Sequence, residues 1–277
     1  MSDIFDTLLL LALPASGKSE VRTYLTAKDP DAFHMGPTVQ LDDYPYVHLQ
    51  ILVDEALADL GHEQAYHHAD SESQRNGPFK DVRELAGLIR LLNEDYAELQ
   101  RGEAERPADP GTRMLERLDA ASVAVGARPK FEAMSADLRA QVAKAIDADA
   151  RKLFEEKADA CPDSLEGKTV VIEFARGGPP GETMPLPEGY GYAGALPHLS
   201  ADILERACIL YIWVTPEESR RKNRARARPD GQGSILVHGT PESVMRAEYS
   251  RCDMHHLADI ASVPGTVHIE AAGRGFD

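Results

Sequence analysis

The sequence has few cysteines and no long apolar run. Its three cysteines, Cys161, Cys208 and Cys252, are odd in number and widely spaced, which excludes a disulfide framework and a zinc knuckle. We therefore expect reduced thiols in a cytoplasmic protein. The apolar run that follows the acidic N-terminus is too short for a signal peptide or a membrane span, so we expect neither export nor membrane insertion.

Basic residues are scarce relative to acidic ones. The chain has 30 Lys and Arg against 46 Asp and Glu, a formal net charge of -16. Because such a surface repels long polyanions, a small molecule is the expected partner and a nucleic acid is disfavoured. The hydrophobic share of 43% and the charged share of 27% are ordinary for a globular protein. No pattern indicates an oligomeric state.

Short apolar and β-branched runs predict about five strands that alternate with helices. Such alternation is typical of an α/β protein with a parallel sheet and helices on both faces. The runs lie at Thr7–Leu13, Thr38–Asp42, Thr169–Phe174, Ala207–Val214 and Thr266–Ile269.

A long helical stretch separates the second predicted strand from the third. Apolar residues recur at helical spacing over about residues 61–165, for example Leu85, Ile89, Leu92 and Tyr96. We interpret this stretch as a helical insertion into a single domain that spans residues 1–277.

A phosphate-binding motif follows the first predicted strand. The run Ala12-Leu13-Pro14-Ala15-Ser16-Gly17-Lys18-Ser19 matches G-x-x-x-x-G-K-[ST] except at the first position, where Ala replaces Gly. In such a loop the backbone of Leu13 to Ser19 surrounds the phosphates, with N–H groups that point inward at a helix N-terminus. We expect Lys18 to reach the β- and γ-phosphates of ATP or GTP and the Ser19 hydroxyl to be a ligand of Mg²⁺. A chance Gly-Lys-Ser at a strand-to-helix turn is the alternative.

The stretch Leu-Pro-Ala-Ser-Gly-Lys-Ser resembles the loop of P-loop kinases. The resemblance is to the group that contains polynucleotide kinases, zeta-toxin-like kinases and the kinases that phosphorylate a seryl group on tRNA. It implies the P-loop NTPase fold with a five-stranded sheet and transfer of a phosphoryl group, but it leaves the acceptor open.

Asp42 and Asp43 close the second predicted strand. The carboxyl ends of parallel strands share one edge of the sheet, so both acids are expected at the edge that carries the phosphate loop. By resemblance to P-loop kinases, Asp42 is the first candidate for the general base and Asp43 the second. A turn or helix cap before Tyr44-Pro45 is the structural alternative.

Glu173 follows Val170-Val171-Ile172 in the third predicted strand, at the position where P-loop proteins place the acid that holds the magnesium shell. It resembles a Walker B acid, with Glu in place of the usual Asp, and an ion pair with Arg176 or another basic neighbour is the alternative. The glycine-rich segment after it predicts a flexible loop, in which Arg176 is a candidate clamp for an anion.

A basic helix is predicted after the fourth strand. Thr215-Pro216-Glu217-Glu218 is a capping box with proline at the first helical position. By resemblance to P-loop kinases, the segment at about 215–235 is a lid whose arginines contact the phosphates. The alternative is a basic helix that only neutralises an acidic surface. Four arginines share one face: Arg220 and Arg221 as nucleotide contacts, and Arg224 and Arg228 as contacts to the transferring group.

These patterns together favour an ATP- or GTP-dependent, Mg²⁺-dependent phosphotransferase that acts on a hydroxyl of a small molecule. Two alternatives remain open. One is an ATPase or nucleotide-dependent switch that acts on a protein partner, and the other is a nucleic-acid or tRNA kinase, which the net charge of -16 opposes.

Overall fold

The computed structural model describes residues 4–28, 33–70, 75–181, 183–226 and 239–277 of the chain. It divides into two compact units, one made of residues 1–38 and 167–277 and the other of residues 39–166. The single domain and the insertion at about 61–165 therefore stay predictions. None of the helices in the described ranges is both long and apolar enough to cross a membrane.

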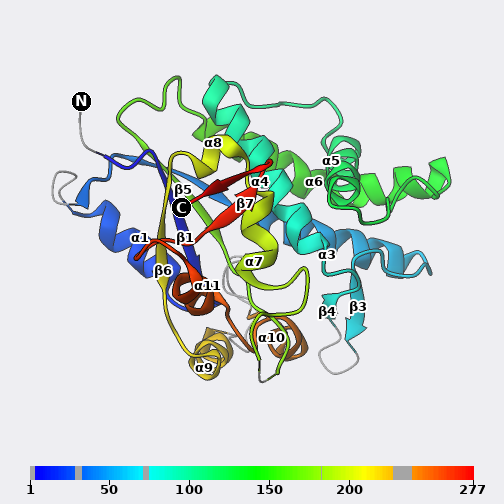
Figure 1. Cartoon of the computed structure of the whole chain (residues 1–277). Helices are drawn as coiled ribbons and strands as arrows, with labels where there is room; N and C mark the ends of the chain where they lie inside the picture. Colours follow the sequence, from blue (N-terminus) through cyan, green and yellow to red (C-terminus); the bar gives the residue numbers. More distant parts are fainter. Residues whose placement is uncertain (1–3, 29–32, 71–74, 182, 227–238) are drawn as a thin grey trace. The chain divides into compact units, whose positions relative to one another are not determined.

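A parallel four-stranded sheet has the strand order β2-β5-β1-β6, of which Figure 1 labels β5, β1 and β6. The central strand β1 pairs with β5 in the register Leu10↔Glu173 and with β6 in the register Ala12↔Ile212. Every residue of β1 and β5 is buried, which explains their continuous apolar runs, since parallel strands are covered on both faces. The strands are β1 (Thr7–Ala12), β2 (Thr38–Asp42), β5 (Thr169–Phe174) and β6 (Ala207–Ile212).

Helices flank this sheet on both faces. Ile212 packs in the cluster that contains Val21 and Leu25 of α1 (Lys18–Thr26), whereas the Tyr211 ring contacts His255 of α11 (Met254–Ile260). Successive side chains of a strand point to opposite faces, so α1 and α11 lie on opposite faces. Among the described residues, the unit of residues 1–38 and 167–277 also contains α7 (Gly191–Ala195), the 3-10 turn η1 (Leu196–His198), α8 (Ala201–Leu204), α9 (Pro216–Arg226) and α10 (Glu242–Glu248).

The prediction of a fifth strand in the sheet is wrong for the described residues. The strand near Thr266–Ile269 lies at β7 (Ile269–Ala271), and it pairs antiparallel with β8 (Arg274–Phe276) in a separate two-stranded sheet. The reason is the turn between them, where Ala272 and Gly273 have φ values of 51° and 76°. Positive φ at both central residues makes a tight hairpin turn, so β8 becomes the neighbour of β7.

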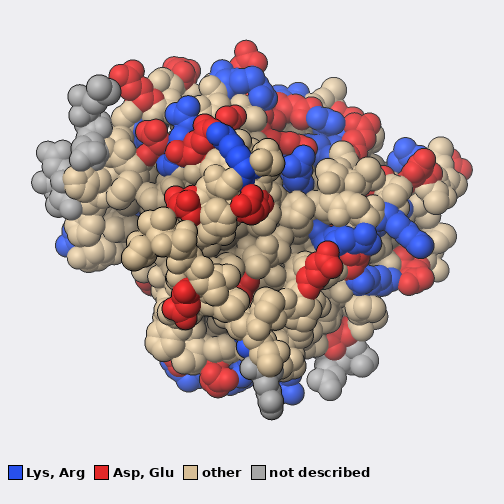
Figure 2. Space-filling view, in the orientation of Figure 1, with Lys and Arg blue, Asp and Glu red and all other residues tan. Residues whose placement is uncertain are grey.

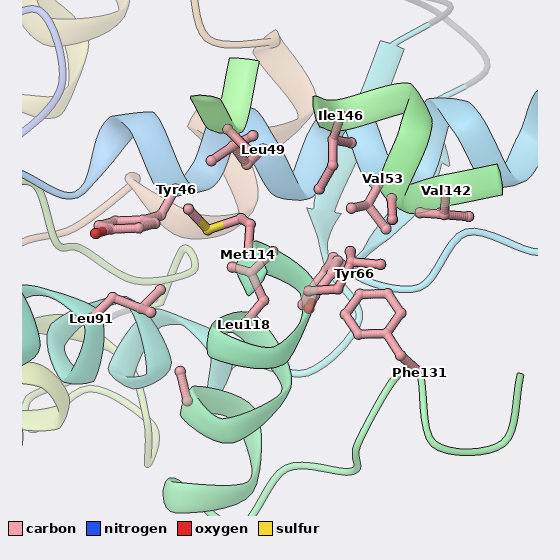
Figure 3. Close-up of a cluster of buried hydrophobic side chains, with 14 of the residues drawn as sticks. Tyr46, Leu49, Val53, Tyr66, Leu91, Met114, Leu118, Phe131, Val142 and Ile146 are labelled. Carbon is pink, nitrogen blue, oxygen red and sulfur yellow. The ribbon is translucent and has the colours of Figure 1, made fainter. Parts of the chain in front are cut away.

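The second unit is mainly helical and has a core of its own. Its elements are α3 (Tyr44–Asp59), β3 (His67–Asp70), β4 (Arg75–Phe79), α4 (Glu84–Arg101), α5 (Pro110–Ala124) and α6 (Ala136–Ala160). Leu49, Leu91, Met114 and Ile146 come from four different helices and point into one buried cluster (Figure 3). Apolar residues at helical spacing thus share one face on each helix.

Charged residues are also buried in this second unit. The Arg117 guanidinium is 2% exposed and donates to Asp95 at 2.8 Å and to Glu94 at 2.9 Å. The Tyr46 hydroxyl donates to the same Asp95 carboxylate at 2.7 Å. Burial raises the pKa of Tyr46 well above its ordinary value, so this hydroxyl keeps its proton. These bonds join α3, α4 and α5.

Candidate phosphate-binding site

The predicted phosphate loop is a tight turn between β1 and α1. β1 ends at Ala12 and α1 begins at Lys18. Two residues between them are left-handed, Ala15 with φ 54° and Gly17 with φ 102°. Alternation of left-handed and ordinary backbone turns successive amide groups toward one side, which creates a concave surface for anions.

Ala12 stands where the motif normally has glycine. It is the last residue of β1, it is fully buried, and its φ is not positive. Glycine is required only where a side chain would strain the backbone. The replacement is therefore compatible with this loop, whose left-handed positions are Ala15 and Gly17.

Several amides of the loop are available to a ligand. The backbone N–H groups of Ala15, Ser16, Gly17 and Ser19 have no hydrogen-bond acceptor among the residues that the structure describes. The first turn of any helix leaves its amides without partners, and the helix dipole places partial positive charge there. The loop thus combines N–H donors and a positive field at one point.

Buried side chains hold the loop carbonyls. The Ser16 hydroxyl donates to Leu13 O at 2.5 Å, and the Ser219 hydroxyl of α9 donates to Pro14 O at 2.6 Å. The Tyr192 hydroxyl donates to Ala12 O at 3.1 Å. Burial raises the pKa of Tyr192 well above its ordinary value, so this phenol remains a donor.

Lys18 lies beside the acid at the end of the neighbouring strand. Its ammonium is 3.9 Å from Glu173 Oε1, and both side chains are nearly buried, at 11% and 10% exposure. Arg22, one turn further along α1, reaches Glu173 Oε2 at 3.2 Å. The structure thus brings Lys18 and Glu173 together, and the basic neighbours of Glu173 include Lys18 and Arg22.

The predicted magnesium ligands are Ser19 and Glu173. Ser19 is exposed in the first turn of α1. Within the described ranges, no group of three or more His, Cys, Asp or Glu side chains could hold a metal ion. Mg²⁺ keeps most of its water and uses one or two protein oxygens together with substrate phosphates, so a hydroxyl and a carboxylate are a suitable donor set.

The sequence predicts a flexible loop after β5 because this segment is rich in glycine. In the structure, hydrogen bonds and close backbone packing fix the segment at Gly177 and Gly178. Gly178 pairs with Arg251 through hydrogen bonds in both directions, at 3.0 and 3.2 Å. A Cβ on Gly177 would lie only 2.6 Å from the carbonyl oxygen of Arg251, so these glycines allow close backbone packing. Arg176 is 2% exposed and its guanidinium lies 5.1 Å from the Phe174 ring.

Helix α9 begins where the capping box predicts, with the Glu218 amide bonded to Thr215 Oγ1 at 3.2 Å. It packs through Ser219 and Asn223, both buried, and Asn223 exchanges two hydrogen bonds with the backbone of Thr240. Figure 1 places α9 and α10 near the carboxyl end of β6.

The predicted arginines of α9 are paired with glutamates. Arg220 lies 3.2 Å from Glu217, Arg221 2.7 Å from Glu218, and Arg224 3.3 Å from Glu242. The side chains of Arg221 and Arg224 are more than half exposed, at 63% and 60%. Arg228 lies outside the described residues.

Asp42 and Asp43 belong to the second unit, where Asp42 ends β2 and Asp43 precedes the first residue of α3. Asp42 Oδ1 accepts a hydrogen bond from the Tyr44 amide at 2.9 Å, which is the turn role given above as the alternative. The Asp43 carboxylate is buried and does not cap the helix. The base assignment of both residues stays a prediction.

Sequence reasoning missed Arg22 and Ser219. Arg22 follows Lys18 by four residues, a spacing that places two side chains on one helix face, so its approach to Glu173 had a sequence signal. Ser219 had none, because its bond to Pro14 O joins positions 205 residues apart. Comparison of the chain with protein-family models and with curated proteins finds no match.

Proposed function

We propose that this chain has a P-loop fold and is a phosphotransferase that moves the γ-phosphoryl group of ATP or GTP to a hydroxyl of a small molecule. The observation that carries the proposal is the loop between β1 and α1. There the left-handed Gly17, the amides of Ala15 to Ser19 and the side chain of Lys18 belong to one short segment at the N-terminus of α1. This combination suits the phosphate groups of a nucleotide.

Mg²⁺ is the implied metal. The Ser19 hydroxyl would bind it directly, and Glu173 would hold its water shell. When bound, it supplies positive charge to the β- and γ-phosphate oxygens. Glu173 suits this role because its carboxylate is beside Lys18, the side chain assigned to the same phosphates.

The reaction needs a proton acceptor and stabilisation of the transferring group. The acceptor oxygen attacks the γ-phosphorus, the bond to the β–γ bridging oxygen breaks, and the nucleoside diphosphate leaves. The hydroxyl proton passes to a carboxylate, for which Asp42 and Asp43 are the candidates.

The arginines of α9 are assigned to the triphosphate. Each described one pairs with a glutamate that is itself partly exposed, for example Arg224 with Glu242 at 35% exposure. Exposed ion pairs contribute little to stability, so exchange of a carboxylate for a phosphate costs little. Arginine also binds phosphate in a bidentate way.

A small acceptor fits the charge distribution better than a nucleic acid. On the face drawn in Figure 2, acidic and basic side chains of the described residues are interspersed, and they form no extended basic stripe there. Sequence-independent binding of nucleic acid depends on such a stripe. Salt-dependent RNA binding would instead favour a tRNA kinase.

The test of nucleotide binding compares Lys18→Ala with Lys28→Ala. Lys28 lies just past the other end of α1, where its ammonium is 4.6 Å from the Tyr24 ring centroid. MgATP should raise the Tm of the wild type and of Lys28→Ala but not that of Lys18→Ala. An unchanged Tm of the wild type at saturating MgATP and MgGTP would refute the proposal.

The test of transfer uses labelled ATP and a mixture of metabolites, with detection of the phosphorylated product by mass spectrometry. Asp42→Asn should keep MgATP binding, because an amide oxygen still accepts the Tyr44 hydrogen bond, and it should suppress product if Asp42 is the base. Fast hydrolysis without any acceptor, stimulated by a protein partner, would favour the switch instead.

A further inference from the structure

The two strands that pair with β1, β5 and β6, end beside side chains of different chemical kinds. At the end of β5, the charged side chains of Glu173, Lys18 and Arg22 are in contact. At the end of β6, the side chains of Trp213 and His255 are aromatic. The phosphate loop follows β1 and therefore lies between a charged side and an aromatic side. A ligand that carries both a polyanion and an aromatic ring suits this arrangement.

Trp213 is placed next to the loop by the register of the sheet. Ile212 pairs with Ala12, so Trp213, one residue further, stands opposite Leu13, the first residue of the loop. Neighbouring strands are about 4.8 Å apart. A nucleoside triphosphate is longer than this spacing. When its phosphates lie at the loop amides, its base can therefore extend past the neighbouring strand.

The Trp213 side chain is unusually open for its size. It is 60% exposed, and it is the one tryptophan of the chain. Its ring contacts His255 edge to face, with centroids 6.0 Å apart at an angle of 70°. His255 in turn packs against Tyr211 at 5.8 Å and 84°. An edge contact fixes the position of the indole while it leaves a ring face open to a planar ligand.

We propose that Trp213, supported by His255, is a stacking platform for the base of the nucleotide whose phosphates occupy the Leu13–Ser19 loop. This inference rests on the proposed nucleotide binding and extends it, because it assigns the residues that hold the base. Stacking is tolerant of base identity, since every base has an aromatic face. The platform therefore adds affinity for nucleotides over inorganic polyphosphate.

The experiment compares ATP with inorganic tripolyphosphate, which has the phosphates but no base. Binding of each is measured by calorimetry and by the emission of Trp213, which is a direct probe because the chain has one tryptophan. ATP should change the emission of the wild type, and tripolyphosphate should not. Trp213→Ala should weaken ATP binding by about tenfold and leave tripolyphosphate binding unchanged. Trp213→Phe should keep most of the ATP affinity that Trp213→Ala loses.

A matched control is available at the other end of β1. Phe5 is 41% exposed and also contacts a histidine edge to face, His34 at 6.2 Å and 64°. It precedes the strand, whereas the loop follows it, so Phe5→Ala should bind ATP and tripolyphosphate as the wild type does. His255→Ala should weaken ATP binding selectively, in the same direction as Trp213→Ala.

Several results overturn the platform. If Trp213→Ala binds ATP as tightly as the wild type while Lys18→Ala loses both ligands, the base lies elsewhere and the proposed function stands. An equal loss of both ligands in Trp213→Ala would mean that Trp213 supports the loop instead. A dimer that dissociates in Trp213→Ala with unchanged ATP affinity would make it a contact with a second copy. If the wild type binds neither ligand, the proposed function fails together with the platform.

Discussion

Glu173→Gln is the substitution that separates a metal-shell role from a purely structural ion pair. In the free protein, the Glu173 carboxylate is 3.9 Å from the Lys18 ammonium. It therefore competes with any phosphate for the same cation. Glutamine keeps the size of the side chain and removes its charge, so Lys18 becomes available to an anion.

The structure sets the size of the effect. At 3.9 Å and an effective dielectric constant of about 20, the two charges attract by about 4 kcal/mol before desolvation is subtracted. Arg22 is 27% exposed and can turn to water, whereas Lys18 is left nearly buried without this counter-charge. We expect the free energy of unfolding to fall by about 1–3 kcal/mol, below the range for a fully buried pair.

Anion binding without metal and phosphoryl transfer with metal should change in opposite directions in Glu173→Gln. Without Mg²⁺, tripolyphosphate should bind Glu173→Gln about tenfold more tightly, since a repelling charge is gone. With Mg²⁺, transfer should fall because the metal shell has lost an acid. Calorimetry and product formation give the two readings.

Glu20→Gln is the matched control. Glu20 pairs with Arg226 at a similar distance, 3.8 Å, but its side chain is 73% exposed. It should leave stability unchanged, because exposed pairs contribute little. If Glu173→Gln weakens tripolyphosphate binding without metal, the competition argument is refuted.

The other predictions concern stability and are read from denaturant or thermal unfolding. Ser219→Ala should lower the free energy of unfolding by about 1–2 kcal/mol, because the carbonyl oxygen of Pro14 loses its hydrogen bond of 2.6 Å from the Ser219 hydroxyl. An unchanged free energy of unfolding would mean that this hydrogen bond does not stabilise the fold. Gly177→Ala should destabilise by about 1–3 kcal/mol, since its Cβ would meet backbone oxygens within 3 Å, whereas Gly181→Ala, whose nearest neighbour is 3.5 Å away, should be tolerated. Burial raises the pKa of Glu84. The contribution of this carboxyl to stability is therefore greatest at acid pH and declines as pH rises through its folded pKa; Glu84→Gln should remove that decline.

The strands of the sheet were predictable because their burial is continuous. β2 and β5 begin and end at the predicted residues, and β1 and β6 end one and two residues earlier than predicted. The prediction that the last strand joins the parallel sheet was wrong. A parallel pairing depends on contacts distant in sequence, whereas the turn at Ala272-Gly273 decides the antiparallel pairing of β7 locally.

The hairpin of β3 and β4 had no usable sequence signal. The strand His67–Asp70 reads His-His-Ala-Asp and lacks an apolar alternation. It is held instead by Asp54 of α3, whose carboxylate accepts from the amides of Tyr66 and His67 at 2.9 Å. Periodicity detects side chains that sort between core and water. It does not detect a strand that a buried carboxylate fixes through its backbone.

The candidate site was predictable where chemistry and spacing coincide. Gly17, Lys18 and Ser19 are adjacent in the sequence, so the helix N-terminus brings them together without long-range information. The contact of Lys18 with Glu173 can be predicted once the pairing of β1 with β5 is assumed. The partners of the α9 arginines were less accessible, because Glu242 lies 18 residues beyond Arg224.

The ion pairs near the loop and on α9 differ in the free energy that a ligand must supply to break them. Those of Arg221 and Arg224 are exposed, so water and salt already screen them, and a phosphate displaces their glutamates at little cost. The pair of Lys18 with Glu173 is nearly buried, and an anion that draws Lys18 away removes a cation from this carboxylate and leaves Arg22 beside it, at a cost in electrostatic free energy. A cation that arrives together with the anion removes that cost. The arrangement at the loop therefore favours a polyphosphate that carries its own divalent metal over the free polyphosphate.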